Sequence, residues 1–258
     1  MEKLVFITGA SSGIGQALAL RYHRAGFRLA LVARRTEIIQ SWLEAENISG
    51  DSCKIYNADV GQPESIQAAA IQCLNQQGVP DVVIANAGIS IGMDTAIASD
   101  IQVMAQTFAV NNIGMAATFQ AFIRPMEQRG SGALVGIASV AGIRGLPGHG
   151  AYCASKAGVI GYCESLRGEL RAAGINVVTI CPGYIDTPLT QRNRYGMPFL
   201  MQAEAFADKA FNAIQSGASY KVIPWQMGFV AKAMRLLPNG IYDKLLQGRP
   251  RKHRVSEE

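Results

Sequence analysis

The chain reads LVFITGASSGIG from Leu4 to Gly15, and this segment decides its fold. The four apolar residues predict a buried strand, and the glycines predict a tight turn. The pattern that follows predicts a helix to about residue 25, which Gly26 ends. Such a turn lets the backbone approach a pyrophosphate, and the helix N-terminus adds unpaired N–H groups. We predict a dinucleotide site at Gly9, Ser11, Ser12, Gly13, Ile14 and Gly15, with a plain strand–helix turn as the alternative.

Strand and helix patterns alternate along the rest of the chain. Further strands are predicted at residues 28–33, 54–57, 81–85, 133–138, 175–180 and 220–223. After Asp81, the run to residue 85 does not alternate and is rich in β-branched residues, as in a strand buried on both faces. This alternation predicts an α/β protein with a single parallel sheet and helices on both faces. We expect one domain in residues 1–223, with residues 224–258 as an apolar and basic extension packed on it.

The second predicted strand ends in two arginines, Arg34 and Arg35. A site for NAD would place an acidic residue here for the ribose 2′-hydroxyl, but no Asp or Glu occurs between residues 26 and 36. A guanidinium could instead bind a 2′-phosphate through charge-assisted hydrogen bonds. We therefore predict NADPH or NADP+ as the coenzyme rather than NADH. A solvated arginine pair at a strand end is the alternative.

Tyr152 and Lys156 stand four residues apart in a predicted helix, so their side chains share one face. A free tyrosine has a pKa of about 10, and an ammonium one turn away is expected to lower that pKa toward neutrality. Ser139 follows the strand at 133–138, at the carboxyl edge where open α/β sheets bind ligands. These three residues predict acid–base chemistry on a carbonyl or hydroxyl. The alternative is a chance Tyr-x-x-x-Lys on a solvated helix.

Two other positions interrupt or adjoin these patterns. Asn111, Asn112 and Gly114 are poor helix formers inside a helical pattern over about residues 99–128, and they predict a kink or a function. His149 could be a second proton relay, although lone histidines are more often structural. A changed pH–rate profile in His149→Ala would reveal such a relay.

The composition excludes several classes of protein. With 49% hydrophobic and 17% charged residues, the 258-residue chain can bury a large core. The net charge is +5, and the last 38 residues alone carry it, since they hold eight Lys or Arg against three Asp or Glu. The rest of the chain is therefore neutral, and a general nucleic-acid surface is not expected. The five cysteines lack metal-ligand spacing, and we predict free thiols and no metal site. Without a signal peptide or a long apolar run, a soluble, cytoplasmic protein is expected.

Two C-terminal segments carry no recognisable motif. Residues 188–201 mix basic and apolar side chains and are either a mobile lid or an ordinary loop, including Arg192, Arg194, Tyr195, Phe199 and Leu200. Residues 225–258 begin with an apolar run and end in basic residues, among them Arg249, Pro250, Arg251, Lys252, His253 and Arg254. This segment could make a peripheral membrane contact. Closing a pocket or forming a subunit contact are the alternatives.

Taken together, these motifs resemble the short-chain dehydrogenase/reductases over about residues 3–223. The family's Thr-Gly-x-x-x-Gly-x-Gly stands at residues 8–15, its Asn-Ala-Gly at 86–88 and its Asn-x-x-Gly at 111–114. Its Ser and Tyr-x-x-x-Lys stand at Ser139, Tyr152 and Lys156, and its Pro-Gly-x-x-x-Thr at 182–187. The resemblance implies a Rossmann-type, doubly wound, seven-stranded sheet, a nicotinamide coenzyme and reversible carbonyl–alcohol chemistry.

The resemblance also implies a role for each matching residue. Tyr152 would be the proton donor, Ser139 would polarise the substrate oxygen, Lys156 would hold the nicotinamide ribose, and Asn111 would hold a water that relays protons. Arg34 would bind the 2′-phosphate. Further coenzyme contacts are implied at Asp59, Val60, Asn86, Ala87, Gly88, Pro182, Gly183, Ile185 and Thr187, besides Tyr152 and Lys156 themselves.

The C-terminal end departs from a common family pattern. Many members, including 3-oxoacyl thioester reductases, end in a tail that forms a tetramer contact, whereas residues 224–258 resemble the hydroxysteroid-dehydrogenase-like branch. A homodimer through the helices near residues 100–128 and 151–173 is expected. The leading hypothesis is an NADPH-dependent reductase of an apolar or amphipathic carbonyl compound. The alternatives are an NADP(H)-sensing protein without turnover, a 3-oxoacyl thioester reductase, and a membrane-associated interaction protein.

Overall fold

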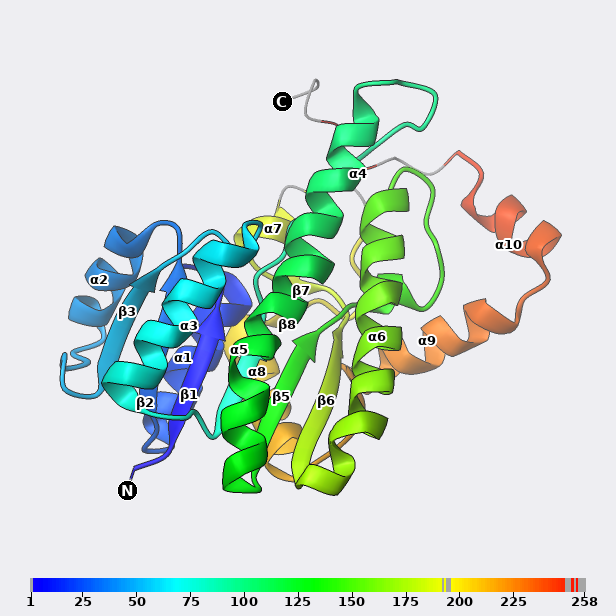
Figure 1. Ribbon diagram of the computed structural model, residues 1–258. Coiled ribbons are helices and arrows are strands. Elements are labelled where there is room, and N and C mark those ends of the chain that lie inside the picture. Colours follow the sequence, from blue (N-terminus) through cyan, green and yellow to red (C-terminus); the bar gives the residue numbers. More distant parts are fainter. Residues whose placement is uncertain (1, 192, 194–195, 249–251, 253, 255–258) are drawn as a thin grey trace.

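A computed structural model describes residues 2–191, 193, 196–248, 252 and 254 of the chain (Figure 1). Seven strands form one parallel sheet in the order β3-β2-β1-β4-β5-β6-β9. Their bounds are β1 (Leu4–Thr8), β2 (Arg28–Ala33), β3 (Cys53–Asn57), β4 (Val82–Ala85), β5 (Gly132–Ile137), β6 (Ile175–Pro182) and β9 (Tyr220–Ile223). The order reverses direction between β1 and β4, which is the switch point of a doubly wound sheet. The predicted fold class is confirmed.

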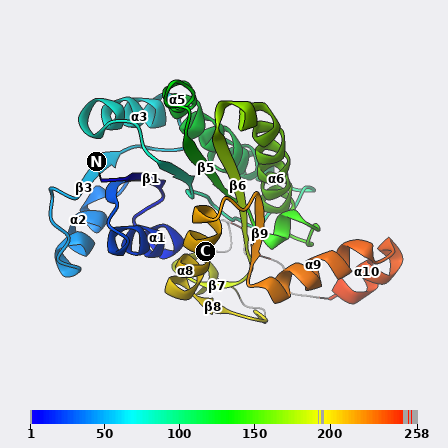
Figure 2. The ribbon, with the colours of Figure 1, turned by 90° about the horizontal axis from the view of Figure 1, so that it is seen from below.

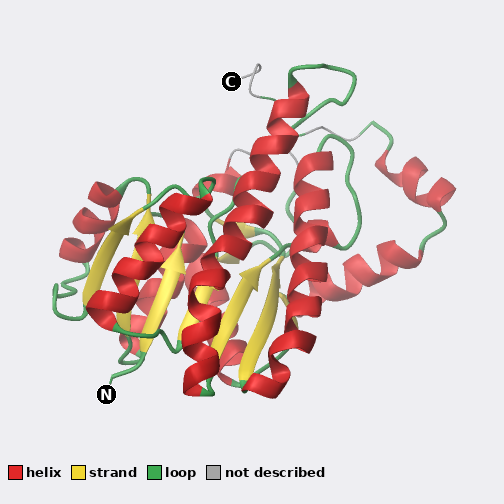
Figure 3. Cartoon of the chain, in the orientation of Figure 1, coloured by secondary structure: helices red, strands yellow, loops and turns green. Residues whose placement is uncertain are grey.

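Helices cover both faces of this sheet, as Figure 3 shows. One face packs on α1 (Gly13–Arg24), α2 (Thr36–Ala45) and α8 (Ala203–Gln215), and the other on α3 (Pro63–Gln77), α5 (Gly114–Arg129) and α6 (Gly150–Leu170). Within β1, Val5 and Ile7 face the first core while Leu4 and Phe6 face the second. The strand is apolar throughout because successive side chains enter opposite cores.

The helix pattern near residues 99–128 is broken as the sequence predicts. It divides into α4 (Asp100–Phe108), a π-helical turn (Ala109–Ile113) and α5. A Cβ on Gly114 would lie 2.1 Å from the Val60 carbonyl oxygen, so only glycine fits where the helix crosses the loop after β3. The wide turn places Asn111 on the buried side of the helix, where its side chain can serve the site.

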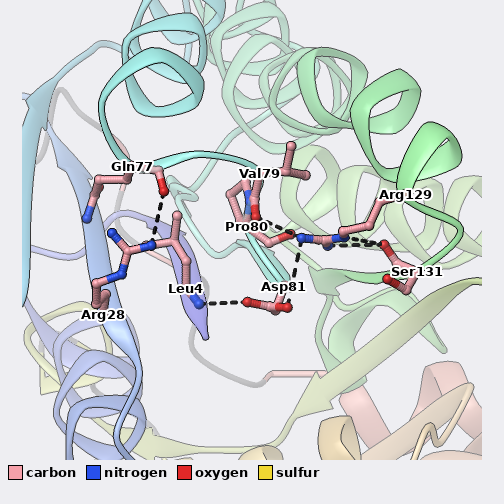
Figure 4. A network of polar contacts seen from close by, with 8 residues as sticks. All are labelled: Leu4, Arg28, Gln77, Val79, Pro80, Asp81, Arg129 and Ser131. Carbon is pink, nitrogen blue, oxygen red and sulfur yellow. Dashed lines mark hydrogen bonds and ion pairs between the residues drawn. The ribbon is translucent and has the colours of Figure 1, made fainter. Parts of the chain in front are cut away.

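Polar contacts brace the opposite, amino edge of the sheet (Figure 4). The Arg129 guanidinium, at the end of α5, donates to the carbonyl oxygens of Val79, Pro80 and Ser131. Asp81 accepts a 2.7 Å hydrogen bond from the Leu4 amide. These contacts tie the entry points of β1, β4 and β5 together, at the end of the sheet away from the predicted site.

Short elements follow the large ones at the carboxyl edge and at the chain end. Single turns are formed by Val140–Gly142 (η2) and Arg171–Ala173 (η3). After β6 come β7 (Ile185–Asp186), α7 (Pro188–Gln191) and β8 (Met201–Gln202), and β7 pairs with β8. The segment at 188–201, expected to be a lid or a loop, begins with α7 and ends at β8. Arg192, Arg194 and Tyr195 lie outside the described residues.

The C-terminal arm, which we define as residues 225–248, contains α9 (Trp225–Leu236) and α10 (Asn239–Leu246). It runs outward beside α6 (Figures 1 and 2). Beyond it, Lys252 donates a 2.7 Å hydrogen bond to Asn193, and Arg254 pairs with Asp100 at 2.7 Å. Arg249, Pro250, Arg251 and His253 lie outside the described residues. Across the part of the chain that is described, no helix is long and apolar enough to cross a membrane.

Candidate active site

The glycine turn after β1 forms a cradle of bare backbone. Gly9 and Gly13 adopt left-handed φ angles of 66° and 57°. Cβ atoms on Gly9, Gly13 and Gly15 would lie 2.9 Å from the Ala87 Cα, 3.0 Å from the Thr187 Cγ2 and 2.2 Å from the Gly9 oxygen. Glycine is therefore required at each position. The partly exposed Ser11, Ser12 and Ile14 complete the turn, and the Ser12 side chain makes no cap hydrogen bond to α1.

Thr8, at the end of β1, connects this cradle to the segment after β4. Its hydroxyl oxygen accepts hydrogen bonds of 3.1 Å from the amides of both Asn86 and Ala87. The Asn86 side chain in turn donates to the Thr8 carbonyl at 3.0 Å. The structure thus brings residues 86 and 87 against the glycine turn. Thr8 was missing from the predicted site, although it opens the Thr-Gly motif.

Ser139, Tyr152, Lys156 and Asn111 gather at the carboxyl edge of β4 and β5. Ser139 follows β5 and is buried; Tyr152 is half-buried on the first turn of α6. The buried Lys156 ammonium donates a 2.8 Å hydrogen bond to the Ile137 carbonyl and lies 5.8 Å from the centre of the Tyr152 ring. The predicted shared face of Tyr152 and Lys156 is therefore present, and Ser139 adjoins it.

The predicted effect of Lys156 on Tyr152 is wrong for this structure. Burial raises the pKa of Tyr152 to about 12, and a hydrogen bond with Ser139 only partly offsets that rise. Burial also lowers the pKa of Lys156 to about 8. A low-dielectric site disfavours the phenolate and the ammonium alike, so burial shifts both pKa values toward the neutral forms. The phenol is accordingly protonated at neutral pH.

Asn111 holds two neighbouring segments of the site in place. Its side chain accepts a 2.9 Å hydrogen bond from the Ile89 amide and donates one of 3.0 Å to the Ile89 carbonyl. It also donates to the Ser155 hydroxyl at 2.9 Å. A Cβ on Gly88 would lie 3.2 Å from the Asn111 oxygen and 3.3 Å from the Lys156 nitrogen. Ser155 was not predicted, and its only signal was its place inside the Tyr-x-x-x-Lys motif.

The arginines predicted to bind the 2′-phosphate follow β2, close to the loop after β3. Arg34 and Arg35 are exposed after β2, and Arg34 lies 3.8 Å from an Asp59 carboxylate oxygen. The other carboxylate oxygen of Asp59 accepts a 2.9 Å hydrogen bond from the Gly61 amide. Val60 is buried beside Asp59. Arg34 can therefore leave a loose, exposed ion pair for a phosphate at little cost.

The segment after β6 closes the other side of the cradle. The Gly183 amide donates a 2.8 Å hydrogen bond to the Ile223 carbonyl, which ties the Pro182-Gly183 pair to β9. Thr187 is buried, and its hydroxyl lies 3.4 Å from the Ile185 carbonyl. Because Thr187 touches Gly13, this segment and the glycine turn face each other across the cradle.

His149 lies just before α6 and is buried. Its Nδ1 atom is 3.1 Å from the Pro147 carbonyl, so this nitrogen carries the proton that is donated. Burial lowers the pKa of His149, and the nearby Lys252 charge adds to that effect. The ring is therefore neutral at pH 7, and its role as a second relay stays a prediction.

These residues fit a nicotinamide coenzyme. The glycines make a cradle that side chains would fill, and the N-terminus of α1 faces it with unpaired backbone N–H groups. Lys156 and Thr187 border the same cradle through Gly88 and Gly13. Searching the described residues finds no group of three or more His, Cys, Asp or Glu side chains that could hold a metal ion.

Comparisons with known proteins identify the family of this chain. A family model described as short chain dehydrogenase matches residues 3–197. An uncharacterized oxidoreductase of Myxococcus xanthus (strain DK1622) is 34% identical over 241 residues, covering 93% of this chain and 95% of that protein. The dehydrogenase/reductase SDR family member 7B of Mus musculus is 30% identical over 274 residues, covering 98% and 83%.

A solved structure extends the comparison to three dimensions. The short-chain dehydrogenase from Sphingobium yanoikuyae in complex with NADPH matches with a TM-score of 0.79 and 26% identity, covering 96% of both chains. The sheet order, the cradle and the family match over residues 3–197 all point the same way. This chain therefore belongs to the short-chain dehydrogenase family of oxidoreductases.

Proposed function

We propose that this protein is an NADPH-dependent reductase that converts an aldehyde or ketone of apolar or amphipathic character into an alcohol. The observation that carries the proposal is the placement of Ser139, Tyr152 and Lys156 beside a backbone cradle for a dinucleotide. A protein that only senses NADP(H) would need the cradle without this acid–base group. The alternative substrate class is the 3-oxoacyl thioesters.

Tyr152 would act as the general acid. Tyr152 would give its hydroxyl proton to the carbonyl oxygen, leaving a phenolate and an alcohol, while a bound nicotinamide coenzyme would be the source of the hydride for the carbonyl carbon. A pKa of about 12 keeps this hydroxyl protonated before the reaction. The Ser139 hydroxyl would hold the carbonyl oxygen beside it. These features favour the reductive direction.

Lys156 and Asn111 would support this proton transfer. Lys156 would bind the ribose hydroxyls of the coenzyme and stabilise the phenolate as it forms, because charge on the phenolate offsets the cost of the buried ammonium. Asn111 holds residue 89 and Ser155, and it would keep the segment after β4 at the correct distance from Lys156. We also propose that Asn111 holds a water molecule that relays protons.

The direct test is coenzyme consumption. Purified protein is incubated with NADPH or NADH and a panel of aldehydes, ketones and 3-oxoacyl thioesters, and absorbance of the reduced coenzyme is followed. We expect turnover of apolar carbonyl compounds with NADPH preferred. Bound NADPH without any turnover across the panel would favour the sensor instead.

Replacing Arg34 by alanine is expected to weaken NADPH binding by about 10–100-fold. The guanidinium would make charge-assisted hydrogen bonds to the 2′-phosphate, each worth about 1.5–3 kcal/mol. NADH lacks that phosphate, so its affinity should stay within about twofold. Fluorescence titration with both coenzymes measures this difference. Equal losses for NADPH and NADH would contradict the assignment of Arg34.

We also propose that the C-terminal arm makes a peripheral membrane contact. Trp225 and Phe229 are 62% and 70% exposed one turn apart on α9, and Lys232 is exposed three residues later. Aromatic and basic side chains together suit the surface of an anionic bilayer. Liposome sedimentation should show binding to vesicles with anionic lipid that Trp225→Ser with Phe229→Ser removes. Equal sedimentation of both proteins would contradict the contact.

We further propose that the protein is a homodimer and is located in the cytoplasm. Ile113, in the π-helical turn just before α5, and Tyr162, on α6, are both exposed, which supports association through these helices. Sedimentation equilibrium would report the mass of the assembly directly.

A further inference from the structure

Few side chains bury the C-terminal arm against the rest of the protein. On α9 only Met227 and Ala231 are buried, and on α10 only Tyr242 and Leu246. Leu236, at the end of α9, is 85% exposed. Because apolar burial stabilises in proportion to its area, this packing is weak for two helices that extend from the body (Figure 2). The position of the arm must depend on other contacts.

Arg144 makes those contacts. Its Nη1 atom donates hydrogen bonds of 2.6, 2.9 and 3.0 Å to the carbonyl oxygens of Met234, Arg235 and Leu237, and Nη2 donates one of 3.2 Å to the Asn239 side chain. The last carbonyls of a helix have no partner within the helix, and a cation is favourable there. Arg144 therefore caps the C-terminal end of α9 from another part of the chain.

Tyr242 of α10 completes a two-way link. The Arg144 guanidinium carbon lies 4.0 Å from the centre of the Tyr242 ring, within the range of a cation–π contact. The Tyr242 hydroxyl donates a 2.7 Å hydrogen bond to the Gly145 carbonyl. Residues 144 and 145 thus hold both helices of the arm, and the planar guanidinium suits both tasks.

The segment that holds the arm also joins Ser139 to Tyr152. A Cβ on Gly142 would lie 2.6 Å from the Lys156 carbonyl carbon, so this segment lies directly on α6 at the lysine. On the other side, a Cβ on Gly183 would lie 2.8 Å from the Met227 side chain. The arm therefore contacts the segment after β6 directly through Met227, and it is linked to α6 at Lys156 through the segment that contains Arg144 and Gly145.

A cavity of about 1180 Å³ lies between the arm, the segment after Ser139 and α6. Its lining combines apolar residues, among them Ile143, Leu146 and Leu246, with the charged Arg144, Arg235, Asp243 and Lys244. Ala141, Gly142 and Cys153 bring it next to Tyr152, which does not itself line it. Ligand sites in proteins usually measure about 300–1,000 Å³, so this space is large enough for part of a substrate. Residues of the arm form one wall of this cavity, and Arg144, which binds the arm, lines it too.

We propose that Arg144 is a positioning residue of the reductase. It fixes the C-terminal arm on the segment between Ser139 and Tyr152, and it thereby sets the wall against which the apolar part of a substrate packs. Arg144 itself takes no part in proton or hydride transfer. The kinetic side of this inference rests on the proposed function, whereas the structural side does not.

Hydrogen exchange tests the structural side without any substrate. In Arg144→Ala, amides of residues 234–246 should exchange at least about tenfold faster, while those of β1 and α1 keep their rates. Arg144→Lys retains the charge but not the planar fork, and should give a smaller increase. Arg124→Ala is the matched control, because Arg124 is an exposed arginine whose side chain pairs with Glu127 on its own helix. Unchanged exchange in Arg144→Ala would overturn the proposal.

Steady-state kinetics test the positioning role. For the best substrate of the panel, Arg144→Ala should raise KM about tenfold and change kcat less than threefold, with NADPH affinity and Tm close to those of the Arg124→Ala control. Arg144→Lys should restore part of the KM. Faster exchange with unaltered KM and kcat would also overturn the proposal. Absence of turnover in the unmodified protein would count against the proposed function, and hydrogen exchange alone would then decide the role of Arg144.

Discussion

Tyr152→Phe is expected to lower kcat by about 10²–10⁴-fold, which is the usual contribution of a positioned general acid. The substitution removes one oxygen and keeps the ring, so packing against Lys156 and Ser139 should change little. NADPH affinity is expected to stay within about twofold, because the cradle is made by backbone after β1 and β4. Single-turnover reduction and fluorescence titration with NADPH measure the two quantities separately.

Tyr162→Phe is the matched control for this experiment. Tyr162 stands on the same helix as Tyr152 but is partly exposed, and its hydroxyl is not part of the proposed site. It should leave kcat unchanged. Turnover retained in Tyr152→Phe would contradict the role of the phenol. An inactive unmodified protein that binds NADPH would favour the sensing function.

The sequence predicts the sheet well, because buried parallel strands are marked by unbroken apolar runs. The strand predicted at residues 81–85 corresponds to β4 (Val82–Ala85), whose four residues are all apolar and buried. The glycines at 9, 13 and 15 also predict a cradle, since their spacing fits only a strand–turn–helix. Both signals are local, and local signals can be followed in a single sequence.

Contacts between distant parts of the chain could not be predicted in this way. Thr8 binds the amides of residues 78 and 79 positions later, and Arg144 binds carbonyls 90 to 93 positions later. Neither residue belongs to a periodic pattern, and nothing in the sequence around it indicates its distant partner. Such roles depend on which loops the sheet order brings together, which the sequence does not mark.

The sequence-based prediction for the pKa of Tyr152 was wrong for a different reason. The helix spacing correctly predicts that Tyr152 and Lys156 share a face, but it contains no information on desolvation. The ammonium lies 2.8 Å from the Ile137 carbonyl oxygen, and burial disfavours the charged form of both side chains. Burial of this kind is set by the whole site, including the loop at Gly142 that covers α6.

The buried ammonium leads to the second large effect, which concerns stability. The free energy of unfolding of Lys156→Met, compared with that of the unmodified protein, is expected to be more favourable at pH 7 than at pH 9.5. The folded state lowers the pKa of Lys156 from 10.5 to about 8, so folding at pH 7 carries the cost of a buried charge. Methionine has a similar length and no charge, and it escapes that cost. The lost hydrogen bond to Ile137 opposes the gain at both pH values alike.

The sign of the pH effect follows from proton binding. Below pH 8 the lysine is charged in both states, and the full penalty is present. As the pH rises from 8 toward 10.5, the folded protein loses this proton while the unfolded chain still binds it, so the stability of the unmodified protein rises. With these two pKa values the penalty falls by about 2 kcal/mol between pH 7 and pH 9.5. Lys156→Met lacks that rise.

Urea unfolding of both proteins at pH 7 and pH 9.5 measures the effect. The quantity of interest is the difference in free energy of unfolding between the unmodified protein and Lys156→Met at each pH, because the buried tyrosines and cysteines titrate equally in both. This difference should shift by about 2 kcal/mol in favour of the unmodified protein at the higher pH. A difference that stays constant would mean that the Lys156 ammonium is not destabilised by burial. The expected shift would show instead that the protein keeps a costly buried lysine at its active site, as stability–activity trade-offs predict.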